Sequence, residues 1–498
     1  FLLAAMLLLV STLSAQTFTQ TVRGTIVDKV SQMPLPGANL VVLNTDPLLG
    51  ATTDVDGNFR LQNIPIGTYT LRISFMGYKE FYVQNLRVNS GKEVVLSIAL
   101  EEDITQMDEI VVRASDVEKN KPINDMAVVS ARTFSVEETQ KYAAAVNDPA
   151  RMVASYAGVV QTQDGNNNIS IRGNSPFGLL WRMEGVDIPN PNHFSDVASS
   201  GGGISILSSQ LLTNSDFMTG AFPAEYGNAL SGVFDLNLRK GNNENREYTF
   251  QAGFLGVDFA AEGPFSKNYN GSYLINYRYS TLSVLDLIGV PLGDAVTNFQ
   301  DLSFNFSLPT KKAGMFSVFG FGGFSDQQSE AVRDSLEWES EYERNDWIYR
   351  SNRGVVGLKH SLTLNPNTYL QSSVVASTTG NGYEEEQLDD DYHLVPEYFQ
   401  DYQLGKLLIS SVINNKLNAK SHLRSGVYFN TINYNLKERY RDDDTDEMVT
   451  HINSTGNAQT IQLFSQLNYR FTEKITLNAG VHYLQLLLNN TYSIEPRA

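Results

Sequence analysis

The strongest constraint on the fold is a two-residue alternation of side-chain character that runs from about residue 242 to the end of the chain. In the stretch GSYLINYRY one face is aromatic or aliphatic: Tyr273, Ile275, Tyr277 and Tyr279. The opposite face is polar apart from Leu274: Ser272, Asn276 and Arg278. The stretch DLSFNFSL repeats the pattern, with Leu302, Phe304, Phe306 and Leu308 opposite Ser303, Asn305 and Ser307. A period of two predicts antiparallel strands with one apolar and one polar face.

Two architectures are compatible with this alternation. A soluble β-sandwich buries the apolar faces of its strands, whereas a transmembrane barrel turns them to lipid and keeps polar side chains inside. Tyr and Phe gather near the strand ends, as they do in the aromatic belts at membrane interfaces. We therefore expect residues 242–498 to form a partial transmembrane antiparallel β-barrel. At roughly ten residues per strand plus loops, about 255 residues supply about ten to twelve strands.

Long acidic inserts lie between the predicted strands and alternate with short turns such as NPN and TEK. They are GFSDQQSEAVRDSLEWESEYERND, NGYEEEQLDDDYHLVPEYFQDY and KERYRDDDTDEMV. This asymmetry is typical of barrels with long extracellular loops and short periplasmic turns. The grouped carboxylates at 384–386, 389–391 and 442–444 offer oxygen ligands for calcium. Solvated loops of like charge are the favoured interpretation, so no metal site is predicted.

The first fifteen residues, FLLAAMLLLVSTLSA, form an uncharged apolar stretch that ends in small residues. This pattern predicts a secretory signal peptide over 1–15. No initiator Met and no basic segment precede Phe1, so its start is expected to be truncated. No later stretch approaches the roughly 18 to 20 apolar residues of a membrane-spanning helix, so later membrane contact must use strands.

Charge and composition exclude several classes of function. The net charge is -18, from 55 acidic and 37 basic residues, which disfavours binding to nucleic acid. The chain has no cysteine, which excludes disulfides and thiol chemistry. Its six histidines are scattered, and neither a zinc-protease motif, a nucleophile elbow nor a P-loop occurs. We expect no enzyme activity, no catalytic residue, no cofactor and no metal.

Residues 16–102 show short alternating runs separated by Gly and Pro, which predict a β-sandwich of roughly seven strands. The stretches RGTIVDKVSQMPLPGANL, TTDVDGNFRL and PIGTYTLRISFMGYK follow one another in this region. Their order resembles the carboxypeptidase-regulatory-like domain, an immunoglobulin- or transthyretin-like fold. The resemblance implies a structural domain and carries no peptidase residues.

The linker 103–115 contains a short run of β-formers between charged residues: Asp108, Glu109, Ile110, Val111 and Val112. An exposed strand of this kind offers backbone donors and acceptors for β-augmentation by a partner. The run DEIVV resembles the TonB box of TonB-dependent outer-membrane receptors. An ordinary connecting strand is the alternative.

Residues 116–241 resemble the plug of the same receptors, an α+β domain, in the stretches GVVQTQDGNNNISIRGNSPFGLLWRMEGVDIPNPNHF and FMTGAFPAEYGNALSGVFDLNLRKG. Arg172 and Gly173 match the family's IRG-type motif, and Tyr226 and Gly227 match its YG turn. Glu184 and Gly185 stand where the family usually has Asp-Gly. The resemblance implies that Arg172 lies buried inside the barrel, where it needs carboxylate or carbonyl partners. Gly201 to Gly203 is expected to be a flexible plug loop.

The resemblance implies energy-coupled import through the outer membrane of a Gram-negative bacterium. The sandwich and the TonB box would be periplasmic, and the partners would be TonB with its inner-membrane motor complex, membrane lipid and a small ligand. That ligand would be a siderophore, vitamin, glycan or peptide, with a surface lipoprotein as a further partner left open. The segment facing it would be NPNHF, with Asn190, Asn192, His193 and Phe194. The alternative is a non-transporting β-rich adhesin or carbohydrate-binding protein.

The plugged barrels of this family have about 22 strands, roughly twice the number expected here. The chain also ends in NNTYSIEPRA, which has a Pro near its last residue and reads as a loop. We therefore expect a fragment that lacks both ends.

Overall fold

The computed structural model describes residues 18–104, 122–127, 129–135, 139, 148–197, 199–253, 256–282, 296–338, 340–472 and 475–498. The chain forms two compact units, residues 1–117 and 118–498. Within the described ranges, no helix is both long and apolar enough to cross a bilayer. The expected signal peptide and Asp108 to Val112 lie outside the described residues.

The first unit is a β-sandwich of seven strands. One sheet has the order β4 (Asn58–Pro65), β1 (Thr19–Asp28) and β7 (Val94–Leu100), with β1 parallel to β7. The second has the order β3 (Leu49–Thr52), β2 (Asn39–Val42), β5 (Gly67–Ser74) and β6 (Phe81–Val88). Alternate apolar side chains from both sheets, among them Ile26, Leu40, Leu71 and Ile73, are fully buried between them. The predicted strand number is confirmed.

The second unit contains a small plug built on a five-stranded sheet. Its order is β12 (Val186–Ile188), β11 (Leu179–Met183), β16 (Gly232–Leu236), β15 (Ser215–Met218) and β8 (Ala131–Phe134). The pairs β9 (Val159–Gln161) with β10 (Ile169–Ile171) and β13 (Asn192–His193) with β14 (Ile204–Ser205) flank it. A short helix, α3 (Pro149–Val153), is capped by the Asp148 side chain. Trp181 stacks on Phe234 at 4.3 Å in the plug core.

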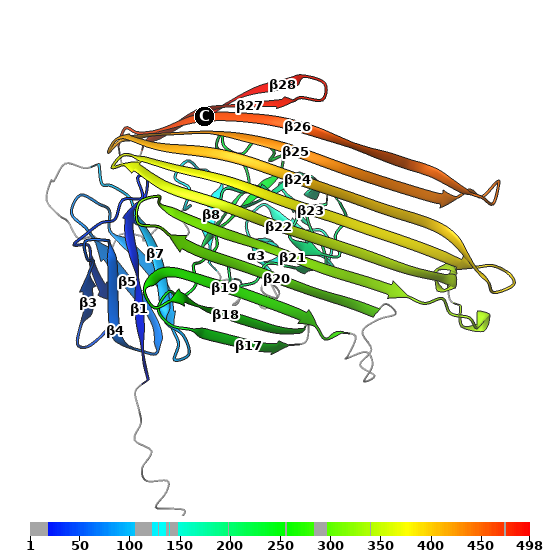
Figure 1. Cartoon of the computed structure of the whole chain (residues 1–498), viewed down its shortest axis with the longest axis horizontal. Coiled ribbons are helices and arrows are strands. Elements are labelled where there is room, and N and C mark those ends of the chain that lie inside the picture. Colours follow the sequence, from blue (N-terminus) through cyan, green and yellow to red (C-terminus); the bar gives the residue numbers. More distant parts are fainter. Residues whose placement is uncertain are drawn as a thin grey trace, which may run out of the picture. The chain divides into compact units, whose positions relative to one another are not determined.

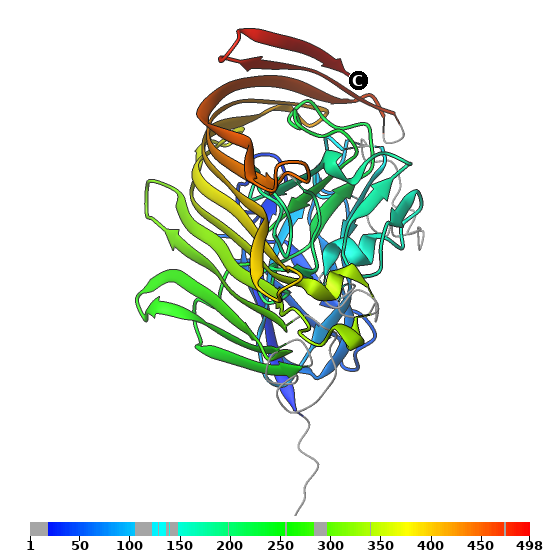
Figure 2. The ribbon, with the colours of Figure 1, turned by 90° about the vertical axis from the view of Figure 1, so that its right-hand side faces the viewer.

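Twelve antiparallel strands, each paired with its neighbours in sequence, form a single curved wall (Figure 1). They are β17 (Glu247–Gly253), β18 (Gly256–Ser266), β19 (Tyr269–Ser280), β20 (Val296–Pro309), β21 (Met315–Ser329), β22 (Asn345–Asn365), β23 (Thr368–Leu388), β24 (Leu394–Asn418), β25 (Ser421–Arg441), β26 (Met448–Arg470), β27 (Thr476–Leu486) and β28 (Thr491–Arg497). The expected partial barrel and its strand number are confirmed. Figure 2 shows the wall curving around the plug, which lies on its concave side.

The wall turns its polar side chains toward the plug and its apolar ones away. On β20, Ser303, Asn305 and Ser307 are buried, whereas Leu302, next to Ser303, is 44% exposed. On β19, Leu274 and Asn276 are buried, while Tyr277 and Tyr279 are exposed. This polarity is the reverse of a soluble sandwich and matches the predicted lipid-facing exterior.

The prediction that the acidic inserts are loops holds for most of the first insert, where residues 330–338 and 340–344 lie between β21 and β22, but it is wrong for most of the second and third. The residues from 381 to 388 belong to β23 and those from 394 to 402 to β24, so only 389–393 connect the two strands. In the third insert, 437–441 belong to β25 and only 442–447 form the connection. Acidic residues have low intrinsic β-propensity, but pairing with a neighbouring strand outweighs it because each added residue extends an existing hydrogen-bond ladder.

The expected loop at the end of the chain is also wrong. Residues Thr491–Arg497 form β28, which pairs with β27 from Leu486 opposite Thr491 to Gly480 opposite Arg497. Pro496 lies within this strand, opposite Val481 of β27.

Candidate functional site

The boundary between plug and wall holds the charged side chains of the plug motifs. The carboxylate of Glu184 accepts a 2.7 Å hydrogen bond from the backbone amide of Leu238 and forms an ion pair with Lys359 of β22. Its backbone carbonyl accepts from Gln371 of β23 at 3.0 Å. Glu184 lies in the left-handed region at φ 54°, before Gly185. The Glu that replaces the usual Asp therefore fastens the plug to two wall strands.

A second junction is centred on Arg182, whose guanidinium is only 1% exposed. It donates to the Tyr428 hydroxyl of β25 at 2.9 Å and to the Gly185 carbonyl at 2.5 Å. Its Nη1 lies 3.5 Å from Glu225, and its guanidinium lies over the Tyr226 ring at 4.5 Å. Arg424 of β25 reaches the same Glu225 carboxylate at 2.8 Å. A buried carboxylate is thus shared by one arginine from the plug and one from the wall, which compensates its desolvation.

The prediction of a buried role for Arg172 is wrong. Its side chain is exposed and donates to two plug hydroxyls, Ser130 at 2.8 Å and Thr219 at 3.4 Å. Among the described plug arginines, the buried guanidinium is that of Arg182, whose side chain reaches the Tyr428 hydroxyl of the wall. Arg172 instead occupies a tight turn at φ 52°, followed by Gly173 at φ 78°.

Tyr226 and Gly227 lie in the plug, and Gly227 lies against β27 of the wall. The Tyr226 hydroxyl donates to Asp235 at 2.7 Å and accepts from Asn124 at 2.8 Å. A Cβ on Gly227 would lie 2.2 Å from Nε2 of His482 on β27. A side chain at this position would therefore force the His482 and Gln462 side chains of the wall to shift, which favours glycine.

The segment predicted to face the ligand, Asn190 to Phe194, lies at another junction. Asn190, Asn192 and His193 are buried, and only Phe194 is half-buried. His193 Nε2 lies 3.0 Å from the Asp301 carboxylate of β20, which also accepts from Arg278 at 2.7 Å. Burial lowers the pKa of His193. In this conformation the segment contacts the wall, and the ligand-facing assignment stays a prediction.

Next to it, the carbonyls of Ser195 and Asp196 accept from Arg353 of β22, whose side chain is buried. The Ser351 hydroxyl donates to the same Ser195 carbonyl at 3.2 Å. The amide of Val197 donates to Asn381 of β23 at 2.9 Å. Backbone groups of the plug loop 195–197 therefore form hydrogen bonds with side chains of two wall strands, β22 and β23, and these bonds hold the loop in place.

The loop of Gly201 to Gly203, expected to be flexible, packs closely against its neighbours. Gly202 donates to Asn167 at 2.8 Å, and the Gly201 carbonyl accepts from Asn190 at 2.8 Å. A Cβ at Gly201 would lie 2.3 Å from the Asn168 side chain, and one at Gly202 would lie 2.4 Å from the His193 carbonyl. These glycines permit close packing of the loop, because a Cβ at Gly201 or Gly202 would overlap neighbouring atoms.

The plug segment 123–126, which follows the linker in sequence, is also tied to the unit's core. The Asp216 carboxylate accepts the amides of Ile123 at 2.9 Å and Asn124 at 2.8 Å. The Asn124 side chain reaches Glu225 at 2.8 Å. The Met126 carbonyl accepts from Asn478 of β27 at 2.7 Å. The first described plug residues thus connect to the Arg182 junction.

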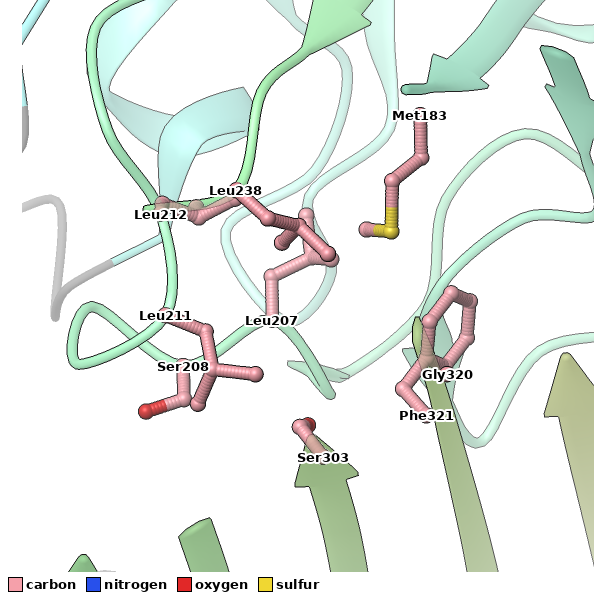
Figure 3. Close-up of a pocket in the computed structure, with 9 residues that line it drawn as sticks. All are labelled: Met183, Leu207, Ser208, Leu211, Leu212, Leu238, Ser303, Gly320 and Phe321. Carbon is pink, nitrogen blue, oxygen red and sulfur yellow. The ribbon is translucent and has the colours of Figure 1, made fainter. Parts of the chain in front are cut away.

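A small recess lies between plug and wall (Figure 3). It is mainly apolar and is lined by Met183, Leu207, Ser208, Leu211, Leu212 and Leu238 from the plug and Ser303, Gly320 and Phe321 from the wall. It is too small for a cargo molecule. Among the described residues, no group of three or more His, Asp or Glu side chains is arranged to hold a metal ion.

Sequence reasoning missed the residues that carry the junctions: Arg182, Glu225, Arg353 and Arg424. One signal was present, because Arg182 interrupts the buried run LLWRM, and a charge within a buried strand requires a partner. Two of its partners, Glu225 and Tyr428, lie 43 and 246 residues away in sequence, so only the fold identifies them.

Comparison with known sequences gives one family and two curated relatives. Residues 22–112 match the CarboxypepD_reg-like domain. The TonB-dependent transporter Oar of Myxococcus xanthus is 26% identical over 238 residues, which are 45% of this chain and 21% of that protein. The TonB-dependent receptor P3 of Formosa agariphila is 25% identical over 279 residues, which are 52% of this chain and 25% of that protein. Each match spans a quarter or less of the relative's length.

Solved structures with a similar fold include two receptors and one transporter. A mutant ferric enterobactin receptor, PfeA of Pseudomonas aeruginosa, has a TM-score of 0.52 at 15% identity, covering 74% of this chain and 59% of its own. The outer membrane transporter YddB of Escherichia coli has a TM-score of 0.52 at 11% identity, covering 74% and 58%. The siderophore receptor PirA of Acinetobacter baumannii has a TM-score of 0.50 at 17% identity, with the same coverage as YddB.

Proposed function

For a chain that combines a CarboxypepD_reg-like domain with the plug-and-barrel fold of TonB-dependent receptors, we propose energy-coupled import across a Gram-negative outer membrane. The observation that carries the proposal is the plug seated on the polar concave face of an outwardly apolar wall. A plug held this way blocks the lumen until it is displaced. The outer membrane has no ATP to drive that displacement, so the work must come from the inner membrane.

Asp108 to Val112 are proposed to receive this work. An exposed strand pairs with TonB by β-augmentation, and the motor complex of the inner membrane pulls on it. The pull would next reach residues 123–126 and, through Asn124, the Glu225 carboxylate. The sandwich and the linker would accordingly be periplasmic. The protein needs no catalytic residue, cofactor or metal for this role.

We propose that the ligand binds on the extracellular side of the plug, between the plug and the ends of the wall strands next to the acidic connections. The likeness to siderophore receptors supports the fold, and their cargo is not transferred to this chain. The proposed ligand is a siderophore, vitamin, glycan or peptide.

The test of coupling uses the complete protein in its native membrane. Ile110→Pro removes one amide donor from the proposed TonB box and blocks strand pairing, so uptake should be lost while ligand binding is retained. Ile110→Val keeps the donor and should retain uptake. Uptake that persists in the proline variant would place the coupling strand elsewhere.

The alternative function, a non-transporting β-rich surface adhesin or carbohydrate-binding protein, finds no support in the polarity of the wall. Its outward face is apolar at Phe250, Phe324 and Leu358, which are 69%, 67% and 45% exposed. A sandwich would bury these side chains. An adhesin should leave the envelope in urea, whereas the proposed barrel should require detergent and migrate differently on gels before and after heating.

A further inference from the structure

The plug-facing side of the wall is rich in tyrosine where β22 to β25 approach the acidic connections. Successive rows of paired residues place seven aromatic side chains on this face of β22 to β25: Trp347, Tyr349, Tyr383, Tyr398, Tyr402, Tyr434 and Tyr440. They alternate in step with Ser351 and Arg353, which contact the plug, so they face the same side. The ring centroids of Tyr383 and Tyr398 are 5.8 Å apart. We call this surface the tyrosine wall.

Two carboxylates share this face. Glu385 pairs with Tyr398 in register, and Glu438 pairs with Gln400, which itself lies opposite Tyr383. Glu385 accepts from the Asn345 amide at 2.5 Å. Glu438 accepts from the Tyr402 hydroxyl and from His451 at 3.0 Å. In the part of the chain that the structure describes, neither carboxylate pairs with a lysine or arginine.

The carboxylates deeper at the boundary of plug and wall are different. Four of them each have a lysine or arginine partner: Glu184 with Lys359, Glu225 with Arg424, Glu262 with Arg239 and Asp301 with Arg278. These pairs neutralise charge that the fold buries. Among the described residues Glu385 and Glu438 have no lysine or arginine partner, and they are held in place by Asn345, Tyr402 and His451.

An unused donor lies at the base of the tyrosine wall. Asn381 is 2% exposed, and its Oδ1 accepts from the plug amide of Val197 at 2.9 Å. This contact fixes the orientation of the amide, and its Nδ2 has no hydrogen-bond partner among the described residues. The residue lies opposite Tyr402 in register and next but one to Tyr383. A buried N–H without a partner is costly, so it suits a carbonyl or hydroxyl oxygen from a bound molecule.

The surrounding segments carry most of the net charge of the protein. Residues 326–350, 383–402 and 435–451 contain twenty-two acidic and six basic side chains, which account for sixteen of the eighteen net negative charges. An entrance lined by charges of one sign attracts ions of the opposite sign and repels ions of the same sign. The potential at the entrance and the charge on the tyrosine wall therefore have the same sign.

We propose that the tyrosine wall binds a cationic, peptide-like ligand. Its ammonium or guanidinium groups would contact the tyrosine faces and the carboxylates of Glu385 and Glu438, because cations bind aromatic faces and unneutralised carboxylates. A backbone carbonyl of the ligand would accept from Asn381 Nδ2. The inference rests on the proposed import function and gives the cargo a class. An anionic iron complex would meet like charge at the entrance and on the wall.

The test measures binding to the complete protein in detergent by isothermal titration calorimetry. The probes are hexalysine, hexalysine acetylated on every side chain, hexaglutamate and the neutral sugar maltohexaose. Hexalysine should bind, and acetylation should weaken it at least about ten-fold because it removes the cations. Hexaglutamate and maltohexaose should not compete. Tighter binding of either of these, or equal binding of the acetylated peptide, overturns the proposal.

Matched variants separate the tyrosine wall from the general field. Glu385→Gln and Glu438→Gln should each weaken hexalysine binding roughly three- to five-fold. Glu384→Gln makes the same change of charge one residue away, on the opposite face of β23, and should alter binding less than about two-fold. Equal effects at 384 and 385 would overturn the site. Heat-dependent gel migration reports whether each variant is folded.

Binding to purified protein needs no TonB, so the two proposals fail separately. If hexalysine does not bind but uptake of the natural cargo depends on Ile110, the cargo class is wrong and import stands. If hexalysine binds as expected but uptake is insensitive to Ile110→Pro, the ligand class stands and the coupling strand does not.

Discussion

The guanidinium of Arg182 in the plug donates a 2.9 Å hydrogen bond to the hydroxyl of Tyr428 in the wall, across 246 residues of sequence. Arg182 also lies 3.5 Å from Glu225, which Arg424 of the wall reaches at 2.8 Å. The plug is thus joined to the wall by a buried charged network. Such networks are costly to break one member at a time, and this gives the first prediction.

Replacing Arg182→Met should destabilise the seating of the plug by about 3 to 5 kcal/mol, because Glu225 would lose one of its two cationic partners while buried. The measurement is the denaturant dependence of plug protection from protease. Arg172→Met removes a guanidinium of the same size from an exposed turn and should have a much smaller effect. If the two variants are equally destabilised, the network does not hold the plug.

Gly227→Ala should loosen the plug, because its new Cβ would lie 2.2 Å from Nε2 of His482. Overpacking of this kind typically costs about 1 to 3 kcal/mol. Thermal unfolding followed by near-UV circular dichroism measures it. Gly165→Ala is the control, since a Cβ there meets nothing within 4 Å. An unchanged melting temperature in the Gly227 variant would show that the wall can move aside.

The stability of the plug should fall in mildly acidic solution. Burial lowers the pKa of His193 below its ordinary value of 6.5, so the unfolded plug takes up a proton more readily than the folded one. The stabilisation is present above the ordinary value and is lost as the pH falls through the lower folded value. Unfolding measured between pH 7 and pH 4 should be less pH-dependent in His193→Gln. An identical pH profile in wild type and variant would exclude His193 as the source.

The cost of placing charge on the outer face should depend on its depth in the membrane. Leu302→Arg lies in the middle of β20 and should cost about 2 to 4 kcal/mol, whereas Leu364→Arg lies near the turn after β22 and should cost about 0 to 1 kcal/mol. The folded fraction on unheated gels, titrated with urea in lipid vesicles, gives the two values. Equal costs would contradict a lipid-facing wall.

The sequence by itself determined that the chain folds mainly into β-strands, and it determined which face of each wall strand is apolar. Alternation over residues 272–279 and 302–308 repeats every two residues, and this local period survives in any sheet because successive side chains point to opposite faces. The seven-stranded sandwich was readable for the same reason. The motif positions Glu184, Gly185 and Gly227 were also readable, although their physical roles were not.

Only the tertiary structure decided which charges are buried and how far each strand extends. Arg172 and Arg182 are both arginines next to apolar strand residues, and the fold alone turns β11 toward the wall and leaves the 172 turn exposed. The acidic residues 384–386 became strand because neighbouring strands offered them hydrogen bonds. Burial and strand length depend on partners that are distant in sequence, and a local pattern carries no information about those partners.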